Sequence, residues 1–555
     1  MFRERTPTQI DMFKDSNQML SVRSQKLLNS KNAWNVVFKT HFMNNINEKP
    51  YALLYNGSQG RPNAPICVML GMMSLKEMNG WSDSQLFDQC RFNIRVRAAL
   101  GLVHIDQDVP TEATYYDFRA KLARHYQEYN EDLIAETFSE VVTAQLSDFN
   151  INGSKIRMDS KLIQSNIAKG NRLQLIIEAV REHIGKINLE ILEDSLSKQQ
   201  LQWLETLQVK STSNLTYNLN GEEKKQMLVE FGHIIHTLYT KDLISKGSIL
   251  YRIYTEHYQE TDTEDNNHGN SDSKQPIEPL PADKIKSDSI QSVHDLDACY
   301  RKKGKDQSEQ TVQGYHSNIT ETCSKDNDLN LVTSVMTAPA NIAESTFLLD
   351  AVEQSQEHLG ENNPIQETIT DGGYDSTTNR KEMSKQGNPA WKMHKLKGRE
   401  RRYQMTFEGE ELKVRDTKND HKDCNVQWSK RANKYKISSP NGTIRYMTKT
   451  QVEDYITALE ITQQATDEDY NLRSNVEATI HEVFHRLLKR QKTRYRGLIK
   501  NHWYVLFRAI SVNLGRIERY LEQTLVLFRF FAFKIVFGSQ IKRMWRKLPI
   551  YLALI

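Results

Sequence analysis

The spacing of apolar residues predicts a helical N-terminal region over residues 1–150. Apolar positions recur at helical intervals over 69–78 and 84–100, which is typical of amphipathic helices. A further helix is expected over 111–122, where Thr111 supplies a capping side chain ahead of the apolar face. No catalytic constellation occurs in this region, so we interpret it as a helical recognition or assembly domain.

After residue 150 the pattern alternates between strands and helices. Short runs of β-branched and apolar residues predict strands that finish near Asp159 and at Asp371, and two more strands over 311–322 and 330–337. Helical spacing is expected over 343–357, from about 376 to 386, and from about 470 to 489. These elements together predict an α/β fold.

Two segments are predicted to be insertions in this core. Residues 173–258 are rich in Leu, Ile, Glu and Lys and read as a helical insertion, whereas 389–465 carries short β-like runs and basic residues. Residues 260–297 hold ten acidic residues, three lysines, three prolines and no aromatic residue. That composition predicts a flexible linker rather than core.

The resulting division has eight parts. They are a helical N-terminal DNA-binding or assembly domain (1–150), the first core strand (151–172), the helical insertion (173–258), an acidic flexible linker (259–300), further core strands and helices (301–388), a β-rich basic insertion (389–465), a core helix with a basic tail (466–520), and a C-terminal helix (521–555).

Composition narrows the protein class. With 555 residues, 38% apolar and 26% charged, the chain can build several domains, and it has too little apolar material for a multi-span membrane protein. Its five cysteines are scattered without a CxxC pair, which disfavours a disulfide framework or a zinc ribbon and predicts reduced intracellular thiols. The N-terminus lacks a signal-peptide pattern. The apolar run 524–538 contains Arg529 and Lys534, so we expect a packed helix there rather than a membrane span.

Charge is distributed unevenly along the chain. The net charge is only +4, but the segment from Arg486 to the last residue contains sixteen Lys and Arg residues and two acidic residues. Such a tail indicates a polyanionic partner, most simply nucleic acid. Alternatively, the basic tail binds anionic lipid, or it neutralises the negative charge of the rest of the chain.

Two carboxylates are candidate metal ligands. Asp159 and Asp371 each follow a predicted apolar strand, and ligands collect at such strand ends in open α/β sheets. Carboxylates there can hold Mg2+. The pair Gly372-Gly373 would let the backbone approach an ion or a phosphate. A single Asp at a strand end is often only a turn former.

A predicted helix adds a third carboxylate. Tyr470, Arg473 and Glu477 lie near one face of this helix. Glu482 is the other candidate for the third carboxylate, but it cannot share a face with Glu477. A solvated face is the ordinary explanation of a helical Glu. Downstream, cations interleave with Tyr495, Trp503 and Tyr504, which suits a groove for a DNA backbone and its bases.

At this point the sequence resembles the bacterial insertion-sequence DDE transposases. The matching segments are Arg157-Met158-Asp159-Ser160-Lys161, Ser165-Asn166, Gly314-Tyr315-His316, Thr370-Asp371-Gly372-Gly373-Tyr374-Asp375-Ser376, Tyr470-x2-Arg473-x3-Glu477, Arg494–Gly497, His502, Ala509, Asn513-Leu514-Gly515-Arg516, Gly60-Arg61-Pro62 and Tyr115-Tyr116-Asp117-Phe118-Arg119.

The resemblance implies an RNase H-like mixed sheet core with a helical N-terminal domain, a helical insertion and a small β-rich insertion. It implies that Asp159, Asp371 and Glu477 are catalytic and bind two Mg2+ or Mn2+ ions, which serve cleavage at element ends and strand transfer into target DNA. It implies DNA contacts by a set of residues in and after the catalytic helix: Tyr470, Arg473, Lys489, Arg490, Lys492, Arg494 and Arg496.

The expected partners are double-stranded DNA, as element ends and target, and a second copy of the chain in a synaptic complex of at least a homodimer. No membrane partner is expected. The expected location is the bacterial cytoplasm, in association with the nucleoid.

Two departures from the family pattern matter. Phe484 stands where a basic residue would follow Glu477 by seven positions, and Lys489 is out of register to replace it. Only Cys424 stands where relatives of this length often carry a cysteine cluster, so no zinc is expected.

Three functions remain in competition. The leading one is a transposase. A catalytically inactive DNA-binding remnant acting as a repressor, or a nuclease that cuts without joining, would share many of these features. The basic residues of 389–465, Lys392, Lys395, Lys397, Arg399, Arg401 and Arg402, either contact the element end or form a solvated loop.

Overall fold

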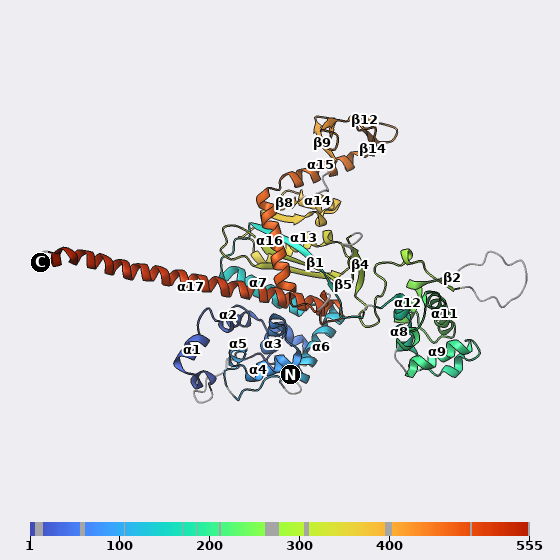
Figure 1. The fold of residues 1–555 in the computed structure, drawn as a ribbon, viewed down its shortest axis with the longest axis horizontal. Helices are drawn as coiled ribbons and strands as arrows, with labels where there is room; N and C mark the ends of the chain where they lie inside the picture. Colours follow the sequence, from blue (N-terminus) through green and yellow to red (C-terminus); the bar gives the residue numbers. More distant parts are fainter. Residues whose placement is uncertain are drawn as a thin grey trace, which may run out of the picture.

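The computed structural model describes residues 1–5, 15–55, 62–104, 106–168, 170–185, 187–209, 213–260, 277–304, 310–394, 402–488 and 491–552. Figure 1 shows a central sheet with the N-terminal helices packed beside it and a helical unit beyond one sheet edge. A small β-rich unit stands on α15, and the long helix α17 projects away from the core.

A mixed six-stranded sheet lies at the centre, in the order β4-β5-β1-β7-β8 with β6 also pairing β5. The pairs β1–β5, β4–β5 and β5–β6 are antiparallel, and β1–β7 and β7–β8 are parallel. This sheet confirms the predicted α/β class. The strands are β1 (Lys155–Gln164), β4 (Cys299–Lys303), β5 (Gln310–Thr322), β6 (Val332–Pro339), β7 (Glu367–Asp371) and β8 (Ala390–His394).

Two strand assignments need correction. β1 does not finish near Asp159, because its antiparallel pairing with β5 continues as far as Gln164 opposite Gly314. β8 belongs to the central sheet, where Thr368 pairs with Trp391, so the β-rich insertion begins after β8 rather than at residue 389. Trp391 is buried and donates its indole N–H to Thr370 Oγ1, which ties β8 to β7.

The N-terminal region is helical, as predicted. Asn93 splits the helix expected over 84–100, because it ends α4 and caps α5 by accepting from the backbone N–H groups of Arg95 and Val96. Thr111 caps α6 as expected. The helices are α1 (Val22–Leu28), α2 (Trp34–His41), α3 (Ile66–Asn79), α4 (Asp83–Phe92), α5 (Ile94–Leu100), α6 (Glu112–Tyr129) and α7 (Leu133–Asp148), with 3-10 turns η1 (Ser16–Met19), η2 (Met43–Asn45) and η3 (Lys49–Leu54).

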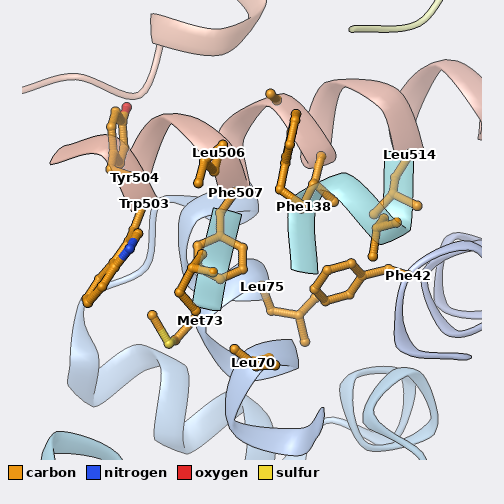
Figure 2. Packing of buried hydrophobic residues seen from close by; sticks show 14 of the residues in the cluster. Phe42, Leu70, Met73, Leu75, Phe138, Trp503, Tyr504, Leu506, Phe507 and Leu514 are labelled. Carbon is orange, nitrogen blue, oxygen red and sulfur yellow. The ribbon is translucent and has the colours of Figure 1, made fainter. Parts of the chain in front are cut away.

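One hydrophobic cluster joins the N-terminal helices to the sheet through α17 (Leu498–Leu552). Trp503, Leu506 and Phe507 of α17 pack over the buried face of α3, which includes Leu70 and Met73 (Figure 2). Tyr315 of β5 and Val335 of β6 belong to the same cluster. The N-terminal helices and the sheet therefore share one core.

The other face of the sheet has its own cluster. Ile156 and Met158 of β1 pack with Leu348 of α13 (Leu348–Leu359) and with Tyr374. The remaining elements around this face are η7 (Glu344–Phe347), η8 (Gly372–Tyr374) and α14 (Thr377–Met383).

The helical insertion follows β1 and has a separate core, as the composition predicts. Part of the expected linker is ordered: Ile277 and Ile290 are buried in that core, and β3 pairs with β2. The acidic stretch 261–276 lies outside the described residues. The elements are α8 (Arg172–Ile184), η4 (Leu189–Leu192), α9 (Lys198–Val209), α10 (Ser213–Thr216), α11 (Gly221–Thr240), α12 (Ile249–His257), β2 (Tyr258–Glu260), β3 (Ile277–Pro279) and η5 (Ala282–Lys284).

The β-rich insertion forms two three-stranded sheets against α15. Tyr403, Val414 and Ile437 pack with Val452 of α15 in its core. The elements are β9 (Tyr403–Glu408), β10 (Glu411–Asp416), β11 (Lys422–Asp423), β12 (Asn425–Ser429), β13 (Lys434–Ser438), β14 (Ile444–Met447) and α15 (Lys449–Gln463).

Two helices complete the chain. α16 covers Asp467–Phe484 and stops short of the predicted end at residue 489. α17 runs without a break through residues 520 and 521, where the division of the sequence separates the basic tail from the C-terminal helix. None of the described helices combines the length and apolar character that crossing a membrane demands.

Candidate active site

Asp159 lies in the middle of β1, just past the point where β1 stops pairing with β7. The parallel pairing with β7 stops at Arg157, whereas the antiparallel pairing with β5 continues through Asp159 opposite Ile319. The carboxylate is therefore beside the end of β7 although its own strand goes on. Its Oδ1 accepts a hydrogen bond from the backbone N–H of Ser160 at 2.8 Å.

Asp371 ends β7, as predicted, and caps the short turn η8. Its Oδ1 accepts from the backbone N–H of Gly373 at 2.8 Å. A Cβ on Gly373 would lie 1.9 Å from Glu344 Oε2. A side chain at this position would therefore force the Glu344 carboxylate to move.

The third carboxylate comes from α16. Thr466 and Asp469 form a capping box that fixes the start of this helix. Glu477 lies one turn beyond Arg473 with its side chain 63% exposed, whereas Glu482 pairs with Arg516 and Arg519 on α17. The helix thus places Glu477, and not Glu482, beside the arginine that contacts the aspartates.

The guanidinium of Arg473 contacts all three carboxylates. Arg473 Nη2 lies 3.5 Å from Asp159 Oδ2 and 3.5 Å from Asp371 Oδ2, and Nη1 lies 3.2 Å from Glu477 Oε1. Arg473 Nε is buried and has no hydrogen-bond partner among the described atoms. Residues from β1, β7 and α16 therefore converge on one point.

The Asp159 carboxyl ionises less readily than an ordinary aspartate. Burial raises the pKa of Asp159 to about 6, and the charge of Asp371 adds to that rise. A raised carboxyl pKa marks a place where additional positive charge would be favourable. One arginine does not neutralise three carboxylates.

The donor chemistry of this site fits a hard divalent cation. The three side chains supply only oxygen atoms, which Mg2+ and Mn2+ prefer. Within the described residues, no three His, Cys, Asp or Glu side chains stand close enough to form a metal cluster, and Arg473 lies among the carboxylates instead. A cation would therefore share or take over the position of this guanidinium.

The residues expected to bind DNA have varied surroundings. Tyr470 is 43% exposed on α16. Lys492 donates to the carbonyl of Ile167, Arg494 donates to the carbonyl of Gly80 at 2.6 Å, and Arg496 donates to that of Asn166 at 2.9 Å. Lys489 and Arg490 lie outside the described residues. Three of the expected cations thus also connect the segment after α16 to the rest of the fold.

The aromatic residues of the basic segment are not stacking surfaces for bases, contrary to the sequence-based interpretation. Trp503 and Tyr504 are each 4% exposed and belong to the main core. Tyr495 donates its hydroxyl to Glu77 of α3. Trp503 and Tyr504 lie on the apolar face of α17, and that face packs against the N-terminal helices.

Of the basic residues noted in the β-rich insertion, two are described and both are paired. Lys392 lies 3.0 Å from Glu367 Oε2, and Arg402 lies 2.9 Å from Asp416 Oδ2. Residues 395–401 lie outside the described part of the chain. Contact of this patch with the element end stays a prediction.

The sequence analysis missed Glu344, which lies beside the site. Lys303 Nζ is 3.2 Å and His316 Nε2 is 3.6 Å from its Oε1. Burial alone would raise the pKa of Glu344, but His316 and Lys303 lower it to about 2. In the sequence Glu344 reads as an ordinary acid at a helix start, so only the fold shows its position.

Two family models match the chain. One, described as a transposase domain (DUF772), covers residues 24–121, and the other, described as a transposase DDE domain, covers residues 292–514. The chain belongs to the insertion-sequence DDE transposases. Its central sheet is accordingly an RNase H-like core. Asp371 and Glu477 of this transposase fall inside the second match, and Asp159 precedes it.

No curated protein and no solved structure matches this transposase.

Proposed function

We propose that the chain catalyses DNA transposition by metal-dependent strand cleavage at the element ends and strand transfer into target DNA. The observation that supports this most is the convergence of Asp159, Asp371 and Glu477 on Arg473 from three separate elements. A strand, a neighbouring strand end and an adjoining helix each bring a carboxylate to the same guanidinium, and cation-assisted phosphoryl transfer needs carboxylates that can bind the same metal ions.

In this proposal each side chain has a defined task. The three carboxylates hold two Mg2+ or Mn2+ ions, which when bound supply an activated attacking hydroxyl and stabilise the leaving 3′ oxygen. Arg473 leaves the carboxylates and pairs with a phosphate, because its planar fork suits two phosphate oxygens. Tyr470, exposed on the same helix, stacks near the terminal nucleotide.

The partners follow from the reaction. Double-stranded DNA binds as element ends and as target, with Lys489, Arg490, Lys492, Arg494 and Arg496 contributing cations along the phosphate backbone. Joining two ends requires at least a homodimer in the synaptic complex. A nucleoid-associated location in the bacterial cytoplasm belongs to the same proposal.

A cleavage and joining assay tests this function. It uses the full chain, DNA carrying the sequences that flank its own gene, and Mg2+ or Mn2+. The Asp371→Asn variant should lose nicking and joining by at least a hundredfold while its DNA affinity stays within about twofold, because only the cation-binding charge is removed. Asp350→Asn, on the exposed surface of α13, is the matched control and should keep full activity.

The other outcomes identify the competing functions. DNA binding without any cut, in both metals, would favour the inactive remnant that acts as a repressor. Nicking without joining would favour the nuclease. Equal activity of Asp371→Asn and Asp350→Asn would contradict the proposed carboxylate site.

A further inference from the structure

A cavity of about 570 Å3 lies between the helical insertion and the β4 edge of the central sheet. One wall comes from the start of α8 and the end of α12, a second from the segment 282–291, and a third from β4. Figure 1 shows the insertion beyond the β4 edge, on the side away from β8. The volume falls in the range of about 300–1,000 Å3 that is usual for small-molecule sites.

The lining of this cavity is strongly basic. Arg172 comes from the insertion, Lys286 from the following segment, and Arg301 and Lys302 from β4. Among the described residues that line it there is no Asp or Glu. A cavity with four cations and no acid selects for an anion.

His257 is a buried polar side chain in the wall of this cavity. It lines the cavity at the end of α12 and is only 4% exposed, yet neither ring nitrogen has a hydrogen-bond partner among the described atoms. Burial and the nearby Arg172 lower the pKa of His257 to about 4, so the ring is neutral and presents one donor and one acceptor. Buried polar atoms are normally satisfied, and an unpaired one costs about 1–3 kcal/mol.

Two other polar groups of the lining are also buried without a hydrogen-bond partner. Arg172 Nε and Asn341 Oδ1 are buried without a partner among the described atoms. The two terminal nitrogens of Arg172 donate to the carbonyls of Leu280 and His257, which fixes the guanidinium in place. The wall therefore holds a positioned cation, and the unpaired atoms behind it expose almost no surface.

We propose that this cavity binds a nucleotide. The phosphate lies beside Lys286 and Lys302, and Arg172 adds positive charge from the wall, where its terminal nitrogens already donate to carbonyls. The base meets the neutral part of the lining, where Asn341 and Gln313 offer amide groups and Tyr300 offers an aromatic ring. A free inorganic anion would leave those neutral groups and most of the volume unused.

The nucleotide has two possible sources, a free nucleotide or a nucleotide within a DNA strand. The cavity is linked to the candidate active site through Arg301, whose Nη1 is 3.2 Å from His316 Nδ1. His316 Nε2 is in turn 2.8 Å from Ser160 Oγ, next to Asp159. The DNA source rests on the proposed function, whereas the free nucleotide does not.

Calorimetric titration of the full chain with deoxyadenosine 5′-monophosphate tests the proposal. One nucleotide should bind per chain, and inorganic phosphate or deoxyadenosine alone should bind at least tenfold more weakly. The double variant Lys286→Gln/Lys302→Gln should weaken nucleotide binding at least tenfold. Both lysines are exposed, so the fold should survive. Lys284→Gln, two residues before Lys286 and outside the lining, is the matched control and should bind normally.

A competition arm separates the two sources. If a 20-base-pair duplex displaces the nucleotide, the cavity receives a nucleotide of the DNA strand; if it does not, the ligand is a free nucleotide. Absence of nucleotide binding, equal binding of inorganic phosphate, or unchanged affinity in the double variant would overturn the proposal. Asp371→Asn should bind the nucleotide normally, so loss of catalysis and loss of this site are distinguishable.

Discussion

At the scale of single residues, Arg473 has an unusual environment. Its two terminal nitrogens contact carboxylates from β1, β7 and α16, while its own side chain is 15% exposed. The guanidinium reduces the repulsion among these carboxylates, and a bound divalent cation would do the same. Arginine and cation therefore compete for one cluster of negative charge.

This competition leads to a prediction for Arg473→Met. Without divalent cations the variant should be less stable than the wild type by about 1–3 kcal/mol, because the carboxylates lose their counter-charge. Mg2+ should then raise its melting temperature more than that of the wild type, since no guanidinium has to be displaced. Thermal unfolding in EDTA and in Mg2+ measures both effects.

Arg519→Met is the control for that experiment, because Arg519 pairs with Glu482 at the surface, away from the aspartates. It should show the wild-type response to Mg2+. Equal Mg2+ shifts for wild type and Arg473→Met would contradict the competition.

Some of this residue-level detail could be predicted from the sequence. Asp371 precedes two glycines at a strand end, and Glu477 follows Arg473 by four positions on a helix, so the local pattern together with the family resemblance indicated both as site residues. Asp159 was identified, but not its place inside a longer strand, because the length of β1 is set by pairing with β5, more than a hundred residues away. Glu344 left no local signal.

At the scale of elements, a buried ion-pair network connects β1, β5, α16 and α17. Glu321 of β5 is fully buried and lies 2.7 Å from Arg157 Nη2 and 2.6 Å from Arg516 Nη1. Its carboxylate also accepts from the Thr479 hydroxyl of α16 at 2.8 Å. The network holds the helix that carries Glu477 against the sheet.

Glu321→Gln should lower the free energy of unfolding by about 3–5 kcal/mol, because it leaves Arg157 without its counter-charge and Arg516 with that of Glu482 alone. Denaturation in urea measures the loss. Glu468→Gln removes an exposed partner of Lys325 and should cost less than about 1 kcal/mol. A similar cost for the two variants would contradict the importance of the buried network.

The pH dependence of the same variant has a definite sign. Burial alone would raise the pKa of Glu321, but Arg516 and Arg157 outweigh burial and hold it below its ordinary value. The stabilisation is therefore present above the pKa of the unfolded chain, about 4.3, and is lost as the pH falls through the lower folded-state pKa. Glu321→Gln should lack this part of the acid dependence.

Periodicity predicted most elements, but it did not predict their partners. It gave α3 and the starts of α6 and α16 within a few residues, and the helical insertion as a region, because each has its own local apolar face. It misjudged the apolar face of α17, whose rings are buried against α3 rather than open to DNA. The ordered residues 277–297 were also missed, because an acidic composition hides the few apolar side chains, such as Ile277 and Ile290, that enter the core.

At the scale of the whole molecule, α17 unites regions that are far apart in the sequence. Its first turns pack on the N-terminal helices, on β6 and on α16, and the main cluster includes residues from all of them. The sequence suggested an independent N-terminal domain and a basic tail. The structure instead has one core in which both participate.

Arg508 of α17 hydrogen-bonds to two of the helices that meet in this core. It is 2% exposed, and its guanidinium donates to the carbonyls of Val483 at 2.8 Å and Glu77 at 3.0 Å. These carbonyls belong to the last turns of α16 and α3, where a cation is favourable because unpaired carbonyl groups face outward. One arginine thus caps a helix of the catalytic core and a helix of the N-terminal region at once.

Arg508→Met should therefore destabilise the whole molecule and not one part of it. The change keeps most of the apolar volume but leaves several buried carbonyls without a donor, so we expect a loss of at least about 3 kcal/mol. Arg508→Lys should lose less, because it keeps the charge but not the planar fork. Hydrogen exchange followed by mass spectrometry should show faster exchange in both α3 and α16 for Arg508→Met. Faster exchange in only one of the two helices would mean that the N-terminal region and the catalytic core unfold independently.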